Sequence, residues 1–99
     1  MEEIFKVIPD FPRYEISNQG RVRSLISNMI LKPHIDPNNG GYSVNLSDMD
    51  GEKVRKQIKL LVAESFLPNP QGYRYVKHKD GNLGNNSVEN LEWTRRREL

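Results

Sequence analysis

The chain has no cysteine among its 99 residues, so it forms neither a disulfide framework nor a thiolate zinc site. A protein without disulfides suits a reducing compartment such as the cytoplasm. No stretch approaches the roughly 20 apolar residues that a membrane-spanning helix needs. The acidic start of the chain also lacks the apolar core of a secretion signal. We therefore expect a soluble cytoplasmic protein with no membrane partner.

A strong charge of one sign is also missing, because the net charge is only +2. Bulk electrostatics alone would not make such a chain a nucleic-acid binder. The basic residues nevertheless gather in four short stretches, which could converge on one phosphate-facing surface or be ordinary solvated edges. The stretches hold Arg21 and Arg23, Lys53 to Lys59, Arg74 to Lys79, and Arg95 to Arg97.

The pattern of apolar residues predicts a single small α+β domain. Alternating apolar and polar residues indicate antiparallel strands, and Gly20 in "NQG" suits the turn of a hairpin. Ile58, Leu61, Val62 and Phe66 have helical spacing, and Pro68 ends that helix. The expected strands lie at 5–8, 14–24, 42–46, around 54, at 75–78 and at 90–93, and the helix lies at 58–66.

Two further expectations concern the connections. The stretch "PHIDPNNGG" predicts an irregular loop in which His34 is a surface residue. Thr94 suits the N-cap of a helix whose first turn is "RRRE", which gives a C-terminal strand-loop-strand-helix unit. We expect Val76, Leu91 and Trp93 to lie in the core of that unit.

Two segments together carry a family resemblance. "FKVIPDFPRYEISNQGRVRSL" resembles the N-terminal DNA-binding module that precedes many phage and intron HNH endonucleases. "LVAESFLPNPQGYRYVKHKDGNLGNNSVENLEW" resembles the HNH (His-Me finger) nuclease core, and "LKPHIDPNNGGYSVNL" is similar to the usual connector. The resemblance implies an N-terminal β module with its connector over residues 1–52. It also implies a ββα-type core over residues 53–99, the two forming one compact unit.

The resemblance assigns roles to particular residues. It makes His78 the candidate general base, which would draw a proton from the attacking water. Asn90 becomes the brace of the loop. The family places metal ligands at the positions of Lys77 and Leu99, where neither side chain offers a lone pair. Lys59 stands where the family has a histidine at the start of the helix.

Other polar residues of the loop have more than one interpretation. Asp80 is either a substitute metal ligand or a turn residue in "KDGN", and Asn85 and Asn86 suit bracing of a compact loop. Lys77 is either a surface lysine or a stand-in that offers its ammonium to a phosphate. We expect no cofactor and no metal, with Mg²⁺ or Mn²⁺ relevant only if the chain is an active nuclease.

Three hypotheses about function follow. The first is a degenerate HNH-like protein of phage or mobile-element type that binds double-stranded DNA or a DNA-processing partner, with weak or no cleavage. The second is an active metal-dependent nicking endonuclease. The third is an inhibitor of a host protein, such as a defence nuclease or polymerase, inside the host cell. The candidate nucleic-acid contacts are Arg21, Arg23, Lys53, Arg55, Lys56, Lys77, Lys79, Arg95, Arg96 and Arg97.

Overall fold

The computed structural model describes residues 2–98 and confirms the α+β class. Every strand and the helix expected from apolar spacing are present. The elements are β1 (Phe5–Ile8), β2 (Phe11–Ser17), β3 (Val22–Ser24), β4 (His34–Ile35), β5 (Tyr42–Ser47), β6 (Lys53–Gln57), α1 (Ile58–Phe66), β7 (Tyr75–His78), a 3-10 helix (Val88–Asn90) and β8 (Leu91–Thr94).

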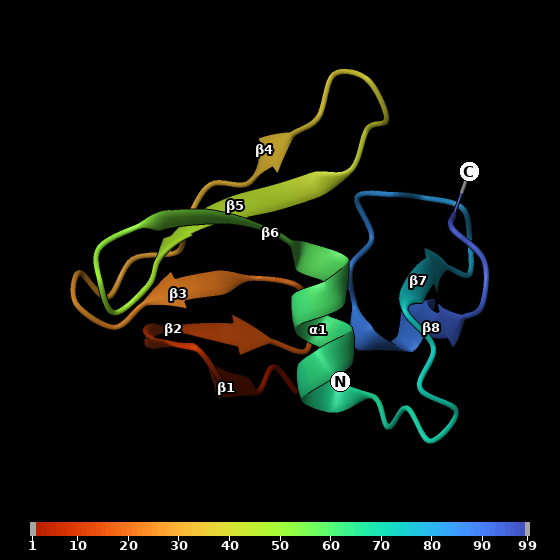
Figure 1. The fold of residues 1–99 in the computed structure, drawn as a ribbon, viewed down its shortest axis with the longest axis horizontal. Helices are drawn as coiled ribbons and strands as arrows, with labels where there is room; N and C mark the ends of the chain where they lie inside the picture. The colour runs from red at the N-terminus through yellow and green to blue at the C-terminus, as the bar shows by residue number, and fades with distance from the viewer. Residues whose placement is uncertain (1, 99) are drawn as a thin grey trace.

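The strands form three antiparallel sheets around one helix. Their orders are β1-β2-β3, β4-β5-β6 and β7-β8. Helix α1 lies between the two three-stranded sheets and the β7-β8 pair, and it contacts strands of all three (Figure 1). The helix is therefore the element that fixes the β7-β8 unit relative to the rest of the chain.

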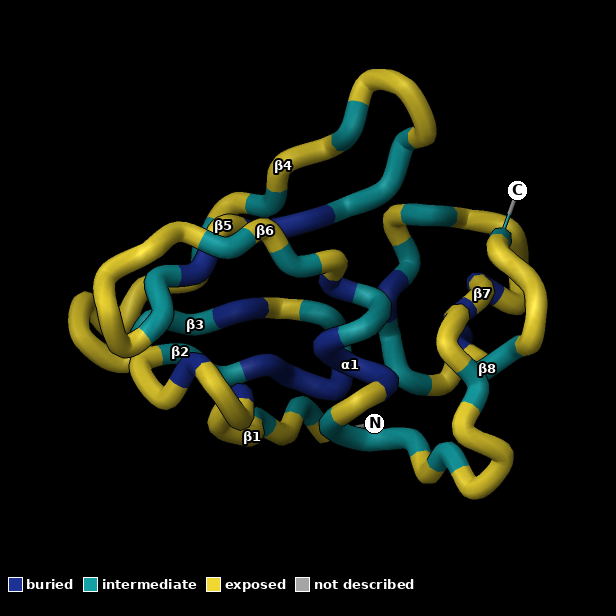
Figure 2. The backbone as a smooth tube through the Cα atoms, viewed as in Figure 1, coloured by how far each residue is buried: buried dark blue, intermediate teal, exposed yellow. Residues whose placement is uncertain are grey.

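The buried side chains form one apolar core. Ile16 and Val22 come from the first sheet, and Leu46 comes from the second. Helix α1 contributes Ile58, Leu61, Val62 and Ala63, while β7 and β8 contribute Val76 and Leu91. The buried segments follow the strands and the inner side of α1, and the loops at the far end of the sheets are exposed (Figure 2). Burial of this apolar surface is the main stabilising term for the fold.

Helix α1 ends where the sequence predicts. Leu67 precedes Pro68 and has an extended backbone, because a residue before proline is sterically disfavoured in the helical region. The Leu67 N–H still donates to the carbonyl oxygen of Ala63, which closes the last turn. Within residues 2–98 no helix is long and apolar enough to cross a membrane.

The prediction of a helix starting at Arg95 is wrong, since residues 95–98 contain only bends and irregular backbone. Three consecutive arginines would oppose the helix dipole at a helix start. The Thr94 hydroxyl instead accepts a hydrogen bond from the Arg96 N–H at 3.5 Å. Leu99, the expected position of a helical ligand, lies outside the described residues.

Two smaller corrections concern a loop and a tryptophan. The loop at "PHIDPNNGG" contains the two-residue strand β4, because His34 and Ile35 pair with Ser43 and Tyr42 of β5. His34 is exposed, as predicted. Trp93 packs against the core but is only half-buried, because its ring lies at the edge where the Nε1–H donates to the carbonyl oxygen of Leu67 at 3.2 Å.

Candidate functional site: the His78 loop

His78 is the last residue of β7, and the alternation of the strand decides which way it points. Val76 and His78 face inward, while Lys77 between them faces solvent. The pairing of His78 with Leu91 of β8 fixes the two ends of the intervening loop. His78 is 6% exposed, so its ring is buried in the protein rather than presented on the surface.

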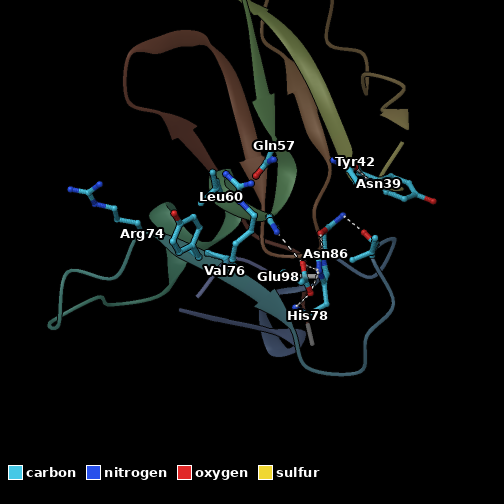
Figure 3. Close-up of a pocket in the computed structure, with 14 residues that line it drawn as sticks. Asn39, Tyr42, Gln57, Leu60, Arg74, Val76, His78, Asn86 and Glu98 are labelled. Carbon is cyan, nitrogen blue, oxygen red and sulfur yellow. Dashed lines mark hydrogen bonds and ion pairs between the residues drawn. The ribbon is translucent and has the colours of Figure 1, made fainter. Parts of the chain in front are cut away.

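Both ring nitrogens of His78 have oxygen partners. Nδ1 lies 2.9 Å from Oε1 of Glu98, and Nε2 lies 2.7 Å from Oδ1 of Asn86 (Figure 3). The amide nitrogen of Asn86 faces the carbonyl oxygen of Leu83 at 3.4 Å, which leaves its oxygen for the ring. A general base needs an accessible lone pair. Because both partners are acceptor oxygens, a neutral His78 ring can donate to only one of them, and both ring nitrogens face protein oxygens rather than an open position for a water molecule.

Glu98 joins His78 to helix α1. Its carboxylate accepts the His78 backbone N–H at 2.7 Å and the Lys59 ammonium at 3.0 Å. Burial of the Glu98 carboxyl group opposes its ionisation. The hydrogen bonds from the His78 backbone, from Lys59 and from the His78 ring outweigh burial and lower the pKa of Glu98. Glu98 is therefore a charged group held inside the site.

Asn90 bridges the two sides of the loop. Its side-chain nitrogen donates to Asp80 Oδ1 and to the Asn85 carbonyl oxygen, both at 2.9 Å. Its side-chain oxygen accepts the Asp80 N–H at 3.1 Å. Hydrogen bonds from the Asn85 side chain, the Asn82 backbone and the Asn90 side chain lower the pKa of Asp80. Both oxygens of Asp80 are thus used inside the loop, as in a turn residue.

The turn between β2 and β3 packs against this loop from the other side. The Val88 N–H donates to the carbonyl oxygen of Asn18 at 2.8 Å, and the Ser87 hydroxyl donates to Gln19 at 3.2 Å. Gly20 has φ +86°, and a Cβ on it would lie 2.8 Å from Cβ of Asn86. Only glycine suits both the left-handed backbone and the close approach. The N-terminal hairpin therefore holds Asn86 against the His78 ring.

A cavity of about 490 Å³ opens beside the His78 ring, between the C-terminal unit, α1 and the β4-β5 connection. Lys59, His78, Asn86, Arg97 and Glu98 are among the residues that line it. Arg74 lines the cavity too, but its side chain extends away from His78 (Figure 3).

The described side chains around His78 offer few of the oxygen ligands that Mg²⁺ or Mn²⁺ prefers. These hard cations prefer several carboxylate, carbonyl or water oxygens. Among residues 2–98 no three His, Asp or Glu side chains gather closely enough to hold a metal ion. The Lys77 ammonium, at the position before the histidine, lies 3.7 Å from Glu92 and brings a positive charge. The carboxylate of Glu98 is already shared between Lys59 and His78.

The predicted nucleic-acid contacts do not share one environment. Arg21 binds the Glu3 carboxylate through Nε at 2.9 Å and Nη2 at 2.5 Å, and its hydrogen bond lowers the pKa of Glu3 to about 2. Arg23 pairs with Glu15 at 2.7 Å and stacks 3.9 Å from the Phe5 ring centroid. Each of these two arginines is therefore already paired with a carboxylate, Arg21 at the surface and Arg23 half-buried.

The basic residues of β6 lie on two different faces of the sheet. Lys53 and Arg55 are exposed on one face, opposite Ser47 and Asn45 of β5. Lys56 faces the other way, with its ammonium 5.5 Å from the centroid of the Phe11 ring. Lys53 and Arg55 make no ion pair within the described part of the chain. The remaining predicted contacts, Lys77, Lys79, Arg95, Arg96 and Arg97, are exposed on the C-terminal unit.

Glu98 is the site residue that sequence reasoning missed. It lies 20 residues from His78 along the chain, in the stretch "RRRE" that the sequence predicts to be the first turn of a helix. Lys59 could have been singled out from the sequence, because it stands where the family has a histidine at the start of the helix. Nothing in the spacing of charges predicts that the Lys59 ammonium and the His78 ring meet on one carboxylate.

Comparison with known proteins places the chain among HNH endonucleases. Residues 3–47 match the NUMOD4 motif. An uncharacterized HNH endonuclease of Acanthamoeba polyphaga mimivirus is 40% identical over 89 residues, which cover 90% of this chain and 22% of that protein. The H-N-H endonuclease F-TflII of Escherichia phage T5 is 38% identical over 91 residues, which cover 90% of this chain and 46% of that protein.

A solved structure of DNA binding and cleavage by the HNH homing endonuclease I-HmuI superposes with a TM-score of 0.82 and 36% identity. The match covers 95% of this chain and 52% of that one. The chain therefore spans about half or less of the length of the relatives that it matches. In sequence and in fold, it belongs to the HNH homing endonuclease family.

Proposed function

We propose that this chain is a DNA-binding member of the HNH family in which the His78 site, as it is held here, supports little or no cleavage. We infer little or no cleavage because both ring nitrogens of His78 lie against oxygen atoms, one of Glu98 and one of Asn86. Lys77 in place of a metal ligand supports it further, because an ammonium group repels a cation and offers no lone pair.

The exposed face of the β4-β5-β6 sheet is the best candidate for contact with DNA. His34, Asn45, Lys53 and Arg55 are exposed on it, on adjacent strands. The lysine and arginine suit phosphate oxygens, and the amide suits hydrogen bonds to phosphates or base edges. A β-sheet surface of this kind can enter the major groove of DNA. The DNA named in the structure of the relative supports the same class of partner.

The turn between β5 and β6 limits where the duplex can lie. It carries Asp48, Asp50 and Glu52, which would repel phosphates. Lys53 adjoins this turn, whereas Arg55 lies two residues further from it. We therefore propose that Arg55 makes the stronger phosphate contact and that the duplex runs across the middle of the sheet.

A binding titration at several salt concentrations tests this proposal. Each phosphate contact that is lost should reduce the slope of log K against log salt by about 0.9. The double variant Lys53→Gln with Arg55→Gln, which keeps much of each alkyl stem, should therefore lower the slope by up to about 1.8. Lys6→Gln with Arg13→Gln, both exposed and outside the candidate contacts, is the matched control with the same loss of charge. Equal slopes in both double variants would remove the sheet face from the interface.

A nicking endonuclease is the second candidate, because a carboxylate on Nδ1 is a common means of orienting a catalytic histidine. A plasmid-nicking assay with Mg²⁺ or Mn²⁺ separates the two. Nicking that His78→Ala abolishes would favour the endonuclease. Binding of DNA without nicking would favour the proposal above. Neither binding nor nicking would favour the hypothesis of an inhibitor of a host protein.

A further inference from the structure

An exposed apolar loop follows β3. Loops are usually polar, yet four of the six residues at 25–30 are apolar and none of the six is charged. Ile26 and Met29 are 76% and 64% exposed. Leu25 and Ile30 are also exposed, so this loop holds four of the nine large apolar side chains that are exposed in the described part of the chain. Such a concentration of exposed apolar surface is typical of a contact with a partner.

The backbone of this loop is held by hydrogen bonds. The Ser24 hydroxyl accepts the N–H groups of Ile26 and Ser27, both at 3.3 Å. The Ser24 N–H donates to the Met29 carbonyl oxygen at 2.9 Å. Asn28 has φ +59°, a left-handed conformation that asparagine adopts more readily than most residues. A partner therefore meets a loop that is already ordered, which lowers the entropic cost of binding.

The turn between β5 and β6 lies at the same end of the molecule. Tyr14 pairs with Ser24, where the apolar loop begins, and its hydroxyl oxygen accepts the Ser47 N–H at 3.3 Å, where the turn begins. Both connections lie at the end of the sheets that is away from the β7-β8 pair (Figure 1). Met49 in the turn is 66% exposed and adds another apolar side chain at this end.

Three acids in the turn set its charge. Asp48 Oδ1 accepts the N–H groups of Asp50 and Glu52, both at 2.9 Å, while the side chains of Asp50 and Glu52 are exposed. The exposed cations Arg13 and Lys53 also lie at this end, so the negative charge is local to the turn. Acids repel DNA phosphates and anionic lipids but attract the lysines and arginines of a protein. A two-fold dimer would place the same acids of both copies in one interface, which is unfavourable.

We propose that residues 25–30 and 48–52 form a docking surface for a protein partner whose contact segment combines apolar side chains with lysine or arginine. Ile26 and Met29 become buried in the contact, and Asp50 and Glu52 pair with the cations of the partner. The two methionines suit this role, because a flexible and polarizable side chain adapts to the shape that it meets. The docking surface lies at one end of the sheets, apart from the middle of the β4-β5-β6 face proposed for DNA.

The probe is a synthetic peptide of leucine and lysine, spaced to form an amphipathic helix, beside its counterpart with glutamate in place of lysine. The chain should bind the lysine peptide more tightly. Its own net charge is +2, so net charge alone would favour the glutamate peptide. NMR should place the contact at the N–H signals of the docking surface. Equal affinity for both peptides, or a contact that maps elsewhere, would overturn the proposal.

An apolar double variant tests the loop. Ile26→Ser with Met29→Ser should weaken binding of the lysine peptide by at least about tenfold, because a few apolar side chains carry most of the energy of an interface. Ile4→Ser with Val7→Ser is the matched control, since these two side chains are also about half exposed. Melting temperatures check that both variants fold. An equal loss of binding in the two variants would rule out the docking surface.

A charge double variant tests the turn. Asp50→Asn with Glu52→Gln should remove the preference for lysine over glutamate, and it leaves the Asp48 side chain that holds the turn. Glu64→Gln with Glu89→Gln removes the same charge from exposed positions elsewhere and should keep the preference. A preference that survives in the first variant, or is lost in both, would contradict pairing with the turn.

Three further measurements separate other occupants of the docking surface. They are titration with a DNA duplex, sedimentation of the chain alone, and binding to vesicles of phosphatidylcholine and phosphatidylserine. Loss of any one of these interactions in the Ile26 and Met29 variant, with no binding of the lysine peptide to the wild type, would assign the surface to DNA, a second copy or a membrane and overturn the proposal. The salt slope of the Lys53 and Arg55 variant is measured independently, so the DNA-binding face and the docking surface can fail separately.

Discussion

The two parts of this molecule are held together by different forces. The two three-stranded sheets and α1 are joined by an apolar core that contains Ile16, Leu46 and Val62, all fully buried. The stretch from His78 to Glu98 buries Leu91 but relies mainly on side-chain hydrogen bonds, with Asn90, Asn86 and Glu98 as the central groups. Apolar contacts are non-directional and redundant, whereas each hydrogen bond depends on the position of one atom.

The largest effect should come from the apolar part. Leu46→Ala should lower the free energy of unfolding by about 2–5 kcal/mol, because it leaves a cavity among close-packed side chains. Chemical denaturation followed by Trp93 fluorescence measures the change. Asn45→Ala, one residue away and exposed, is the control and should stay within about 0.5 kcal/mol of the wild type. A similar loss in both variants would show that the sheet, and not the core, sets stability.

A smaller and more local effect should follow from breaking the loop brace. Asn90→Ala removes three hydrogen bonds and should cost about 1–3 kcal/mol, since it leaves polar groups of the loop unsatisfied. Hydrogen exchange should increase mainly between residues 79 and 90. Asn82→Ala, which removes an exposed bond to the Gly84 N–H, is the control. Uniform loss of protection across the sheets would contradict a separate polar unit.

The smallest effect should be the loss of the Glu98 contacts when its carboxylate is protonated at low pH. The pKa of Glu98 is lowered in the folded protein, so the contribution of its carboxylate is fully present above the unfolded value of about 4.3. That contribution is lost as the pH falls through the lower folded pKa. The partners that face the carboxylate are His78 and Lys59.

NMR of the Glu98 carboxyl group and of the His78 N–H checks this acid response. Both signals should change together below about pH 4.3. Glu98→Gln should abolish the change at the His78 N–H. A transition of the N–H in that variant at the same pH would assign the effect to another group.

The part of the molecule that sequence predicts well is the part with a regular apolar pattern. The alternation around Val22, Val44 and Val76 and the helical spacing of α1 each identify an element, because burial selects one face at a fixed period. The prediction of a helix from Arg95 failed because it rested on a cap residue and a resemblance, with no apolar stripe to support it. Trp93 was expected in the core and packs against it, but it is half-buried, because the sequence does not show how near the edge of the core a residue lies.

By itself the sequence determined the fold class, the strand and helix positions, the family resemblance and the placement of His78 and Asn90 at the two ends of one loop. Only the tertiary structure decided that Arg21 and Arg23 are paired with acids, that Lys53 and Arg55 share a face without Lys56, and that Glu98 holds His78 and Lys59 together. The physical reason is the separation along the sequence between the residues that interact. Periodicity records the burial of neighbours a few residues apart, whereas an ion pair between residues 39 positions apart depends on how whole elements pack.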